Sequence, residues 1–158
     1  MEDMNPDTDA TLKQLAAVLR SDWMGGGLEF LNSRVPHRFT GAYRIEEDCL
    51  YNVGLYDKLG AVLPSDLMAV PLKDSYCQFV LRHGSPRTSD SRAERLLDGS
   101  PFQSRVISYA GVPIVLASGH VWGSVCHFDF ETRNIDDDEF QLLQQAATLI
   151  VPYLPEPT

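Results

Sequence analysis

The chain has 158 residues and a formal net charge of −9 at pH 7. A single domain of that length buries roughly two-thirds of its unfolded surface and needs no disulfide staples. The longest apolar run, residues 110–117, is far too short to span a bilayer, and no Lys/Arg cluster offsets the negative charge. We therefore expect a soluble protein that binds neither nucleic acid nor membranes.

The ends of the chain and its cysteines predict the cellular location of the protein, the redox state of its thiols and the limits of its domain. The opening sequence MEDMNPDTDA is acidic and has no apolar signal core, which predicts a cytoplasmic protein. Three cysteines without close spacing favour reduced thiols over a disulfide framework. We expect a disordered tail over residues 1–7, one domain over 8–152 and a second tail over 153–158.

The first third of the chain predicts two helices followed by a hairpin. Thr8 is a candidate cap for a helix whose apolar face is formed by Leu12, Leu15, Ala16 and Leu19. The sequence MGGG at 24–27 should end this helix, and a second short helix should end before Pro36. Residues 38–57 are rich in β-branched and aromatic residues around a polar turn, which predicts two strands.

The middle of the chain predicts an irregular connection. Residues 58–74 contain apolar side chains without a clean period, and two prolines. Ser75 and Gln78 form a capping-box pattern, and Gly84 supplies a stop, so a helix of about two turns is predicted over 76–83. A short strand at 86–89 and a helical turn at 92–97 should follow.

The last third predicts a long hairpin and a closing helix. Two apolar segments flank the turn at Ser118 and Gly119, and Asp136 with Glu139 forms a second capping box. The helix that follows carries one apolar stripe, formed by Phe140, Leu143, Ala147 and Ile150. This element order predicts an α+β fold in which helices from both ends of the chain cover one face of a sheet. The middle connection should cover the other face and leave a pocket beneath it.

Three segments together resemble a GAF domain. They are SYCQFVLRHGSPRTSDSRAE, YAGVPI and GHVWGSVCHFDFETRNIDDDEFQLLQQAA, and the resemblance extends over about residues 8–152. It implies a profilin-like antiparallel sheet of about six strands, with a small-molecule pocket on the face opposite the terminal helices. GAF domains usually act as sensory modules that bind cyclic nucleotides, tetrapyrroles, haem, amino acids or nitrate. Many dimerise through their terminal helices, and here any signal would pass to a separate protein.

Four aromatic residues and one cysteine are candidates for the pocket lining. The aromatic candidates are Tyr76, Phe79, Phe102 and Tyr109, with Tyr43 and Tyr56 as further possibilities, although aromatic residues at such positions are also typical of a core. Cys77 is predicted to have a packing role, either lining the pocket or lying behind its wall. Attachment of a bilin is the alternative, but Gln78 stands where the chromophore-binding cysteines that it resembles are usually followed by histidine.

Two pairs of polar residues are further candidates. Arg92, beside Asp90, could hold a carboxylate or phosphate at the pocket mouth, or the two could form a local ion pair. His127 and Asp129 share a strand face, which suits a general base or metal ligand as well as a structural hydrogen bond. His37, His83 and His120 are predicted to be surface or loop histidines.

These observations leave three hypotheses of function. The first is a non-catalytic sensor that binds a small molecule of unknown identity, with an unknown cofactor if any, as a homodimer that signals through a partner. The second is a thiol-dependent redox enzyme or sensor resembling free methionine-(R)-sulfoxide reductase and using Cys77 or Cys126. The cysteines of those enzymes cluster before the central hairpin, whereas residues 78–125 contain none here. The third is a partner-binding module with a collapsed pocket.

Overall fold

The centre of the molecule is a six-stranded antiparallel sheet. This computed structural model describes residues 6–61, 65–76, 87–94, 100–103 and 105–155. The strands lie in the order β3-β2-β1-β6-β5-β4 and all neighbours are antiparallel. Their bounds are β1 Phe39–Glu46, β2 Cys49–Asp57, β3 Ala69–Pro71, β4 Arg87–Thr88, β5 Ser108–Val115 and β6 Val121–Asp129. The predicted α+β fold is confirmed.

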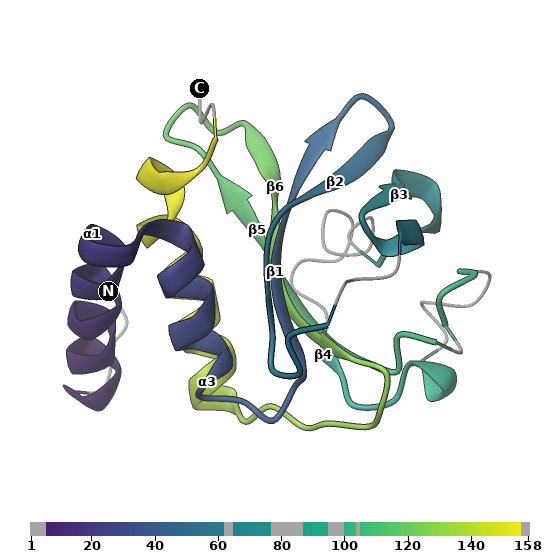
Figure 1. The fold of residues 1–158 in the computed structure, drawn as a ribbon, viewed down its shortest axis with the longest axis horizontal. Helices are drawn as coiled ribbons and strands as arrows, with labels where there is room; N and C mark the ends of the chain where they lie inside the picture. The colour runs from purple at the N-terminus through teal and green to yellow at the C-terminus, as the bar shows by residue number, and fades with distance from the viewer. Residues whose placement is uncertain (1–5, 62–64, 77–86, 95–99, 104, 156–158) are drawn as a thin grey trace.

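The two long helices cover one face of the sheet, and the connection that carries β3 covers the other (Figure 1). Helix α1 spans Pro6–Asn32 and α3 spans Asp137–Leu149. The side chain of Asp136 accepts a hydrogen bond from the Glu139 backbone N–H, so the predicted cap of α3 is confirmed. No helix in the described part of the chain combines the length and the apolarity needed to cross a bilayer.

Helix α1 differs from the prediction at its start and in its middle. It begins at Pro6, so Thr8 lies inside the helix and does not cap it. In its middle, α1 consists of two helical segments joined by a kink at Trp23, directly before the break predicted at residues 24–27, and the glycines at 25–27 lie within the second segment. Trp23 has φ 60° and ψ −157°, a region normally occupied by glycine. A Cβ at Gly26 would overlap the Cβ of Asp22. The glycine therefore provides the close approach of two turns at the kink.

The two predicted hairpins are confirmed, and the connection between them contains more structure than its sequence pattern indicated. The short 3-10 helices η1 Ser65–Leu67 and η2 Leu72–Asp74 flank β3. The short strand predicted at 86–89 is present as β4, and a 3-10 turn, η3 Ser91–Ala93, begins one residue before the helical turn predicted at 92–97. Strand β3 was missed because it has only three residues and ends in proline. The predicted helix over 76–83 lies outside the described residues after Tyr76.

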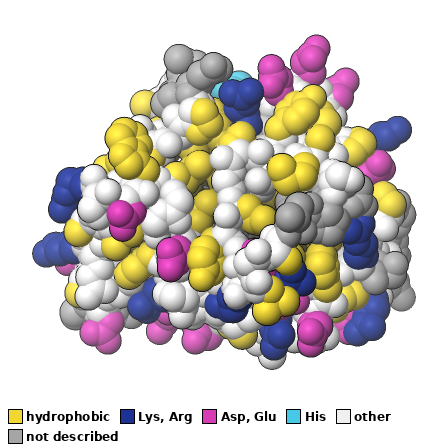
Figure 2. Space-filling model, in the orientation of Figure 1, with side chains coloured by type: hydrophobic (Ala, Val, Ile, Leu, Met, Phe, Trp, Pro, Cys, Tyr) yellow, Lys and Arg dark blue, Asp and Glu magenta, His cyan; other side chains and the backbone are white. Residues whose placement is uncertain are grey.

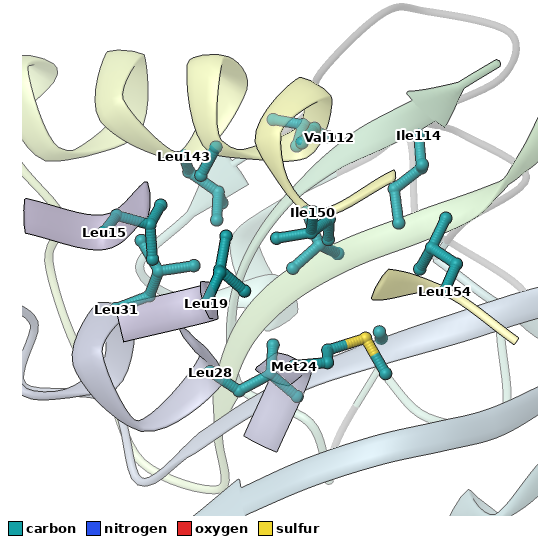
Figure 3. Close-up of a cluster of buried hydrophobic side chains, with 14 of the residues drawn as sticks. Leu15, Leu19, Met24, Leu28, Leu31, Val112, Ile114, Leu143, Ile150 and Leu154 are labelled. Carbon is teal, nitrogen blue, oxygen red and sulfur yellow. The ribbon is translucent and has the colours of Figure 1, made fainter. Parts of the chain in front are cut away.

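Two hydrophobic clusters lie on opposite faces of the sheet. In the first, side chains from α1, α3 and β5 point toward one another (Figure 3), among them Leu15, Leu19, Leu28, Val112, Ile114, Leu143 and Ile150. The second cluster packs beneath the connection and contains Phe39, Tyr43, Leu50, Leu67, Val70, Tyr76, Val106, Tyr109, Cys126 and Phe128. The helix side is thus sealed mainly by aliphatic side chains around the buried Trp122, and more of the buried aromatic residues lie on the other side.

Candidate ligand cavity

A cavity of about 60 Å³ lies within the second cluster, between the sheet and the connection. Its lining residues come from β1, β2, η1, β3, β5, β6 and the segments at 75–76 and 102–106. Among the described residues they are Tyr43, Leu50, Leu67, Val70, Ser75, Tyr76, Phe102, Val106, Tyr109, Cys126 and Phe128. None of these is Asp, Glu, Lys, Arg or His, so the described wall of the cavity carries no ionisable acid or base other than phenols and a thiol.

The floor of the cavity is a row of small residues across three strands. Cys126 on β6 lies opposite Gly41 on β1 and opposite Gly111 on β5. Directly opposed residues project from the same face of a sheet, so the thiol is flanked by positions without a Cβ. The Tyr109 ring occupies the place that a Cβ at Gly111 would take. A Cβ at Gly41 would lie 3.3 Å from side-chain atoms of Asn52 and Leu55, so each glycine admits a neighbouring side chain beside Cys126.

The walls are held in place by hydroxyl groups that donate to backbone carbonyls. Tyr43 donates to the Leu67 carbonyl at 2.9 Å, which fixes η1 over β1. The single hydroxyl proton of Tyr76 is shared between the carbonyls of Phe102 and Val106, whose oxygens lie 2.9 and 2.8 Å from the hydroxyl oxygen, and this fixes the segment before β5. The Tyr76 ring also meets the Tyr109 ring edge to face at 5.2 Å. The Tyr43 hydroxyl therefore joins the connection to the sheet, and the Tyr76 hydroxyl joins the segment after η2 to the segment before β5.

The protein environment around Tyr76 disfavours charge. Burial raises the pKa of Tyr76 to about 12, although a hydrogen bond with Ser91 acts in the opposite direction. The phenol is therefore neutral at any physiological pH, and an ionised group brought to this wall would lose its hydration in the same way.

The aromatic candidates separate into three groups. Tyr76, Phe102 and Tyr109 meet at the cavity, as does Tyr43. Tyr56 instead packs against the helix-side cluster. Cys77 and Phe79 lie outside the described residues.

Asp90 and Arg92 bind each other. The Arg92 guanidinium donates two hydrogen bonds to the Asp90 carboxylate, at 2.8 and 2.9 Å, and the same carboxylate accepts from the Arg92 backbone N–H. The Arg92 side chain is 59% exposed, and neither residue is among the described lining of the cavity. The geometry corresponds to the local ion pair that was the alternative interpretation.

His127 lies on the helix side of the sheet, away from the cavity. Its Nδ1 is 2.6 Å from the Thr40 hydroxyl, which also accepts from the Asn32 amide. Its ring lies 5.9 Å from that of His37. The carboxylate of Asp129 accepts hydrogen bonds from the Arg38 backbone N–H and from the Arg133 guanidinium. This placement favours the structural interpretation of His127 over a pocket residue.

His37 is a correction to the sequence analysis. It was expected at the surface, but its side chain is only 1% exposed. Burial lowers the pKa of His37 to about 4 and that of His127 to about 3, although the Asp129 carboxylate acts in the opposite direction on His37. Both imidazoles are therefore neutral near pH 7. In the described residues, no three His, Cys, Asp or Glu side chains are placed to hold a metal ion.

Several cavity residues were not recognised as such from the sequence. Leu50, Leu67 and Val70 belong to the cavity wall, and Cys126 forms its floor. The alternation along β6 contained a usable signal, because Cys126 and Phe128 share a face that differs from that of His127. No comparable signal marks Leu67 or Val70, which lie in the irregular connection.

Comparison with known proteins identifies the family. Residues 8–151 match the GAF domain family. The chain belongs to this family. No protein of curated function matches the sequence. Among solved structures, the GAF domain of an Acinetobacter phosphoenolpyruvate-protein phosphotransferase is 13% identical, with a TM-score of 0.72 over 93% of this chain and 92% of that one.

Two other kinds of GAF structure are similar. The type II free methionine-R-sulfoxide reductase of Thermoplasma acidophilum is 20% identical, with a TM-score of 0.66 over 88% of this chain and 94% of that chain. The chromophore-binding domain of a bacteriophytochrome from R. palustris is 10% identical, with a TM-score of 0.69 over 91% of this chain and 60% of that chain. At these identities the likeness concerns the fold of the GAF domain and not its chemistry.

Proposed function

We propose that this GAF domain is a non-catalytic sensory module that binds a small molecule in the cavity over Cys126. The observation that carries the proposal is the cavity itself. It lies on the sheet face opposite the helices, and its wall is built jointly by the sheet and by the connection. A ligand there would contact the sheet and the connection at once, and so would shift the equilibrium between conformations in which the two pack differently. A separate partner protein would read that change.

Thermal-shift screening tests this proposal. A ligand present at 100 times its dissociation constant stabilises the folded state by about 2.7 kcal/mol. In a domain of this size that corresponds to a rise in melting temperature of about 5–10 °C. The screen should include metabolites, nucleotides, tetrapyrroles and small uncharged compounds such as short alcohols. If no compound raises the melting temperature, the hypothesis of a partner-binding module without a ligand replaces the sensor.

The cellular setting of the proposed sensor has two parts. We propose a homodimer formed through the terminal helices, and the cytoplasm as its compartment. Trp23 supports the first part, because its side chain is 64% exposed at the α1 kink and packs edge to face on Tyr153 from the other end of the chain. Exposed aromatic side chains of this kind are common anchors of protein interfaces.

A thiol-dependent redox function is the second candidate, because Cys126 lines the cavity. Two thiols would reduce a sulfoxide to a sulfide and water while forming one disulfide. Cys49 is badly placed as the second thiol. It lies opposite Glu46 and Cys126 lies opposite Gly41 on β1, a separation of about 17 Å along the strand. A disulfide requires Cα atoms within about 7 Å.

Cysteine replacement separates the two candidate functions. Under the sensor hypothesis, Cys126→Ser and Cys49→Ser should both retain ligand binding. Under the redox hypothesis, the wild-type protein should reduce free methionine sulfoxide in an NADPH-coupled assay, and Cys126→Ser should abolish that activity. An inactive wild-type protein would exclude this sulfoxide as the substrate.

A further inference from the structure

We propose that the cavity over Cys126 selects a small, uncharged and largely apolar ligand and rejects carboxylates, phosphates and ammonium groups. This inference rests on the proposed sensory function and specifies its ligand class. It follows from the charge, the hydrogen bonding and the size of the cavity, each of which can be considered separately.

The charge of the cavity wall provides the first step. Its described residues include no acidic, basic or imidazole side chain that could pair with an ionised ligand. Arg92, the cation proposed for the pocket mouth, donates to both carboxylate oxygens of Asp90. A buried ion without a partner costs several kcal/mol of desolvation, which the contacts of a small ligand do not repay.

The hydrogen bonds of the wall provide the second step. The hydroxyls of Tyr43, Ser75 and Tyr76 each donate their proton to a backbone carbonyl of the connection. A carboxylate or phosphate requires donors, and these donors are already engaged. Buried polar side-chain atoms that lack a hydrogen bond in the described structure, such as Nδ1 of His37 and Nε1 of Trp122, are not on lining residues. Among its described residues, the wall thus presents no buried side-chain donor or acceptor that lacks a hydrogen bond.

The size of the cavity provides the third step. Its volume of about 60 Å³ is well below the roughly 150 Å³ of an apolar protein cavity that binds benzene. The described wall therefore accommodates a ligand of a few heavy atoms. Such a ligand gains at most about 1.5 kcal/mol per heavy atom, so millimolar affinity is expected.

The test uses four probes of similar size on the intact chain. Xenon and 1-propanol are uncharged. Propionate and propylammonium are an anion and a cation with the same number of carbon atoms as 1-propanol. Binding is followed by 129Xe NMR for xenon and by methyl chemical shifts of the protein for the other three. Val70→Phe and Leu67→Phe fill the cavity from two sides. Val115→Phe is the matched control, because the same change is made at a side chain that is 45% exposed.

Xenon and 1-propanol should bind the wild type and Val115→Phe, with at least a tenfold weaker response in Val70→Phe or Leu67→Phe. Propionate and propylammonium should leave the methyl shifts of the cavity unchanged. Shifts of the cavity methyls by either ion equal to those caused by 1-propanol would overturn the ligand class but leave the proposed sensor intact. If none of the four probes reaches these methyls, or if both filled variants bind as the wild type does, the ligand class and the cavity as a binding site both fail.

Discussion

At the scale of single residues, Tyr76 shows how one side chain serves both the wall and the connection. Its ring faces the cavity, and its hydroxyl holds the backbone of the segment before β5. The sequence singled out Tyr76 through its aromatic character, because residue type predicts burial well. It could not reveal the partners of the hydroxyl, since these are carbonyls of a distant segment.

Replacement of Tyr76 by Phe should destabilise the domain by about 0.5–1.5 kcal/mol, because the hydrogen bond of its hydroxyl to the Phe102 and Val106 carbonyls is lost while both carbonyls keep other donors. Urea unfolding measures the free energy of unfolding of the variant and the wild type. Tyr51→Phe is the control, at a side chain that is 41% exposed, and should change stability by less than about 0.5 kcal/mol. Equal stability of Tyr76→Phe and the wild type would show that the hydroxyl does not hold the connection.

The buried histidines predict a loss of stability in mild acid. Burial lowers the pKa of His37 to about 4 and that of His127 to about 3, whereas an unfolded histidine has a pKa of about 6.5. Between these values the unfolded state binds more protons, so stability falls as pH falls from about 6.5 to 4. Each histidine contributes a slope of up to about 1.4 kcal/mol per pH unit.

Urea unfolding between pH 7 and pH 5 measures this slope. His37→Gln should lower it relative to the wild type, and His120→Gln, at an exposed histidine of the β5–β6 turn, should leave it unchanged. A wild-type slope that His37→Gln does not alter would mean that His37 is protonated or exposed in the folded protein.

At the scale of elements, periodicity and caps predicted the regular parts well. The stripe of α3, its Asp136 cap and both hairpins depend on neighbouring residues, which the sequence displays directly. The glycines at 25–27 also indicated a break in the first helix, but its exact position at Trp23 depends on how the second half of α1 packs Met24, Leu28 and Leu31 (Figure 3). Strand β3 likewise exists through its pairing with β2 and not through its own pattern.

The glycines of α1 should respond differently to alanine. A Cβ at Gly25 meets nothing within 4 Å, so Gly25→Ala should stabilise the helix by about 0.5–1 kcal/mol. A Cβ at Gly26 would overlap Asp22, whose Cβ moves only with the backbone, so Gly26→Ala should destabilise it by about 1–3 kcal/mol. Thermal unfolding of both variants provides the comparison. The same effect at both positions would contradict the geometry of the kink.

At the scale of the whole molecule, the two faces of the sheet differ in how they are packed. The helix face is filled mainly by aliphatic side chains, whereas the other face contains the cavity. Charged side chains of both signs are interspersed on the surface seen in Figure 2. The sequence predicted this division from element order, but the cavity residues were only half recognised because the connection lacks a period.

The proposed dimer predicts a specific role for Trp23. Trp23→Ser should weaken self-association at least tenfold, because exposed aromatic anchors often contribute more than about 1.4 kcal/mol to an interface. Sedimentation equilibrium measures the dissociation constant. Leu59→Ser is the control, at a side chain that is 71% exposed and lies after β2. A wild-type protein that stays monomeric, or a Trp23→Ser variant that associates as the wild type does, would place the interface elsewhere.

The most direct test of the sensor is a methyl-resolved NMR titration with the strongest stabilising compound from the screen. A ligand over Cys126 should shift the methyl signals of Leu50, Leu67 and Val70, which line the cavity, while those of Leu143 on the helix side stay in place. Shifts confined to the helix-side methyls, or saturating stabilisation without any shift of the cavity methyls, would contradict the account.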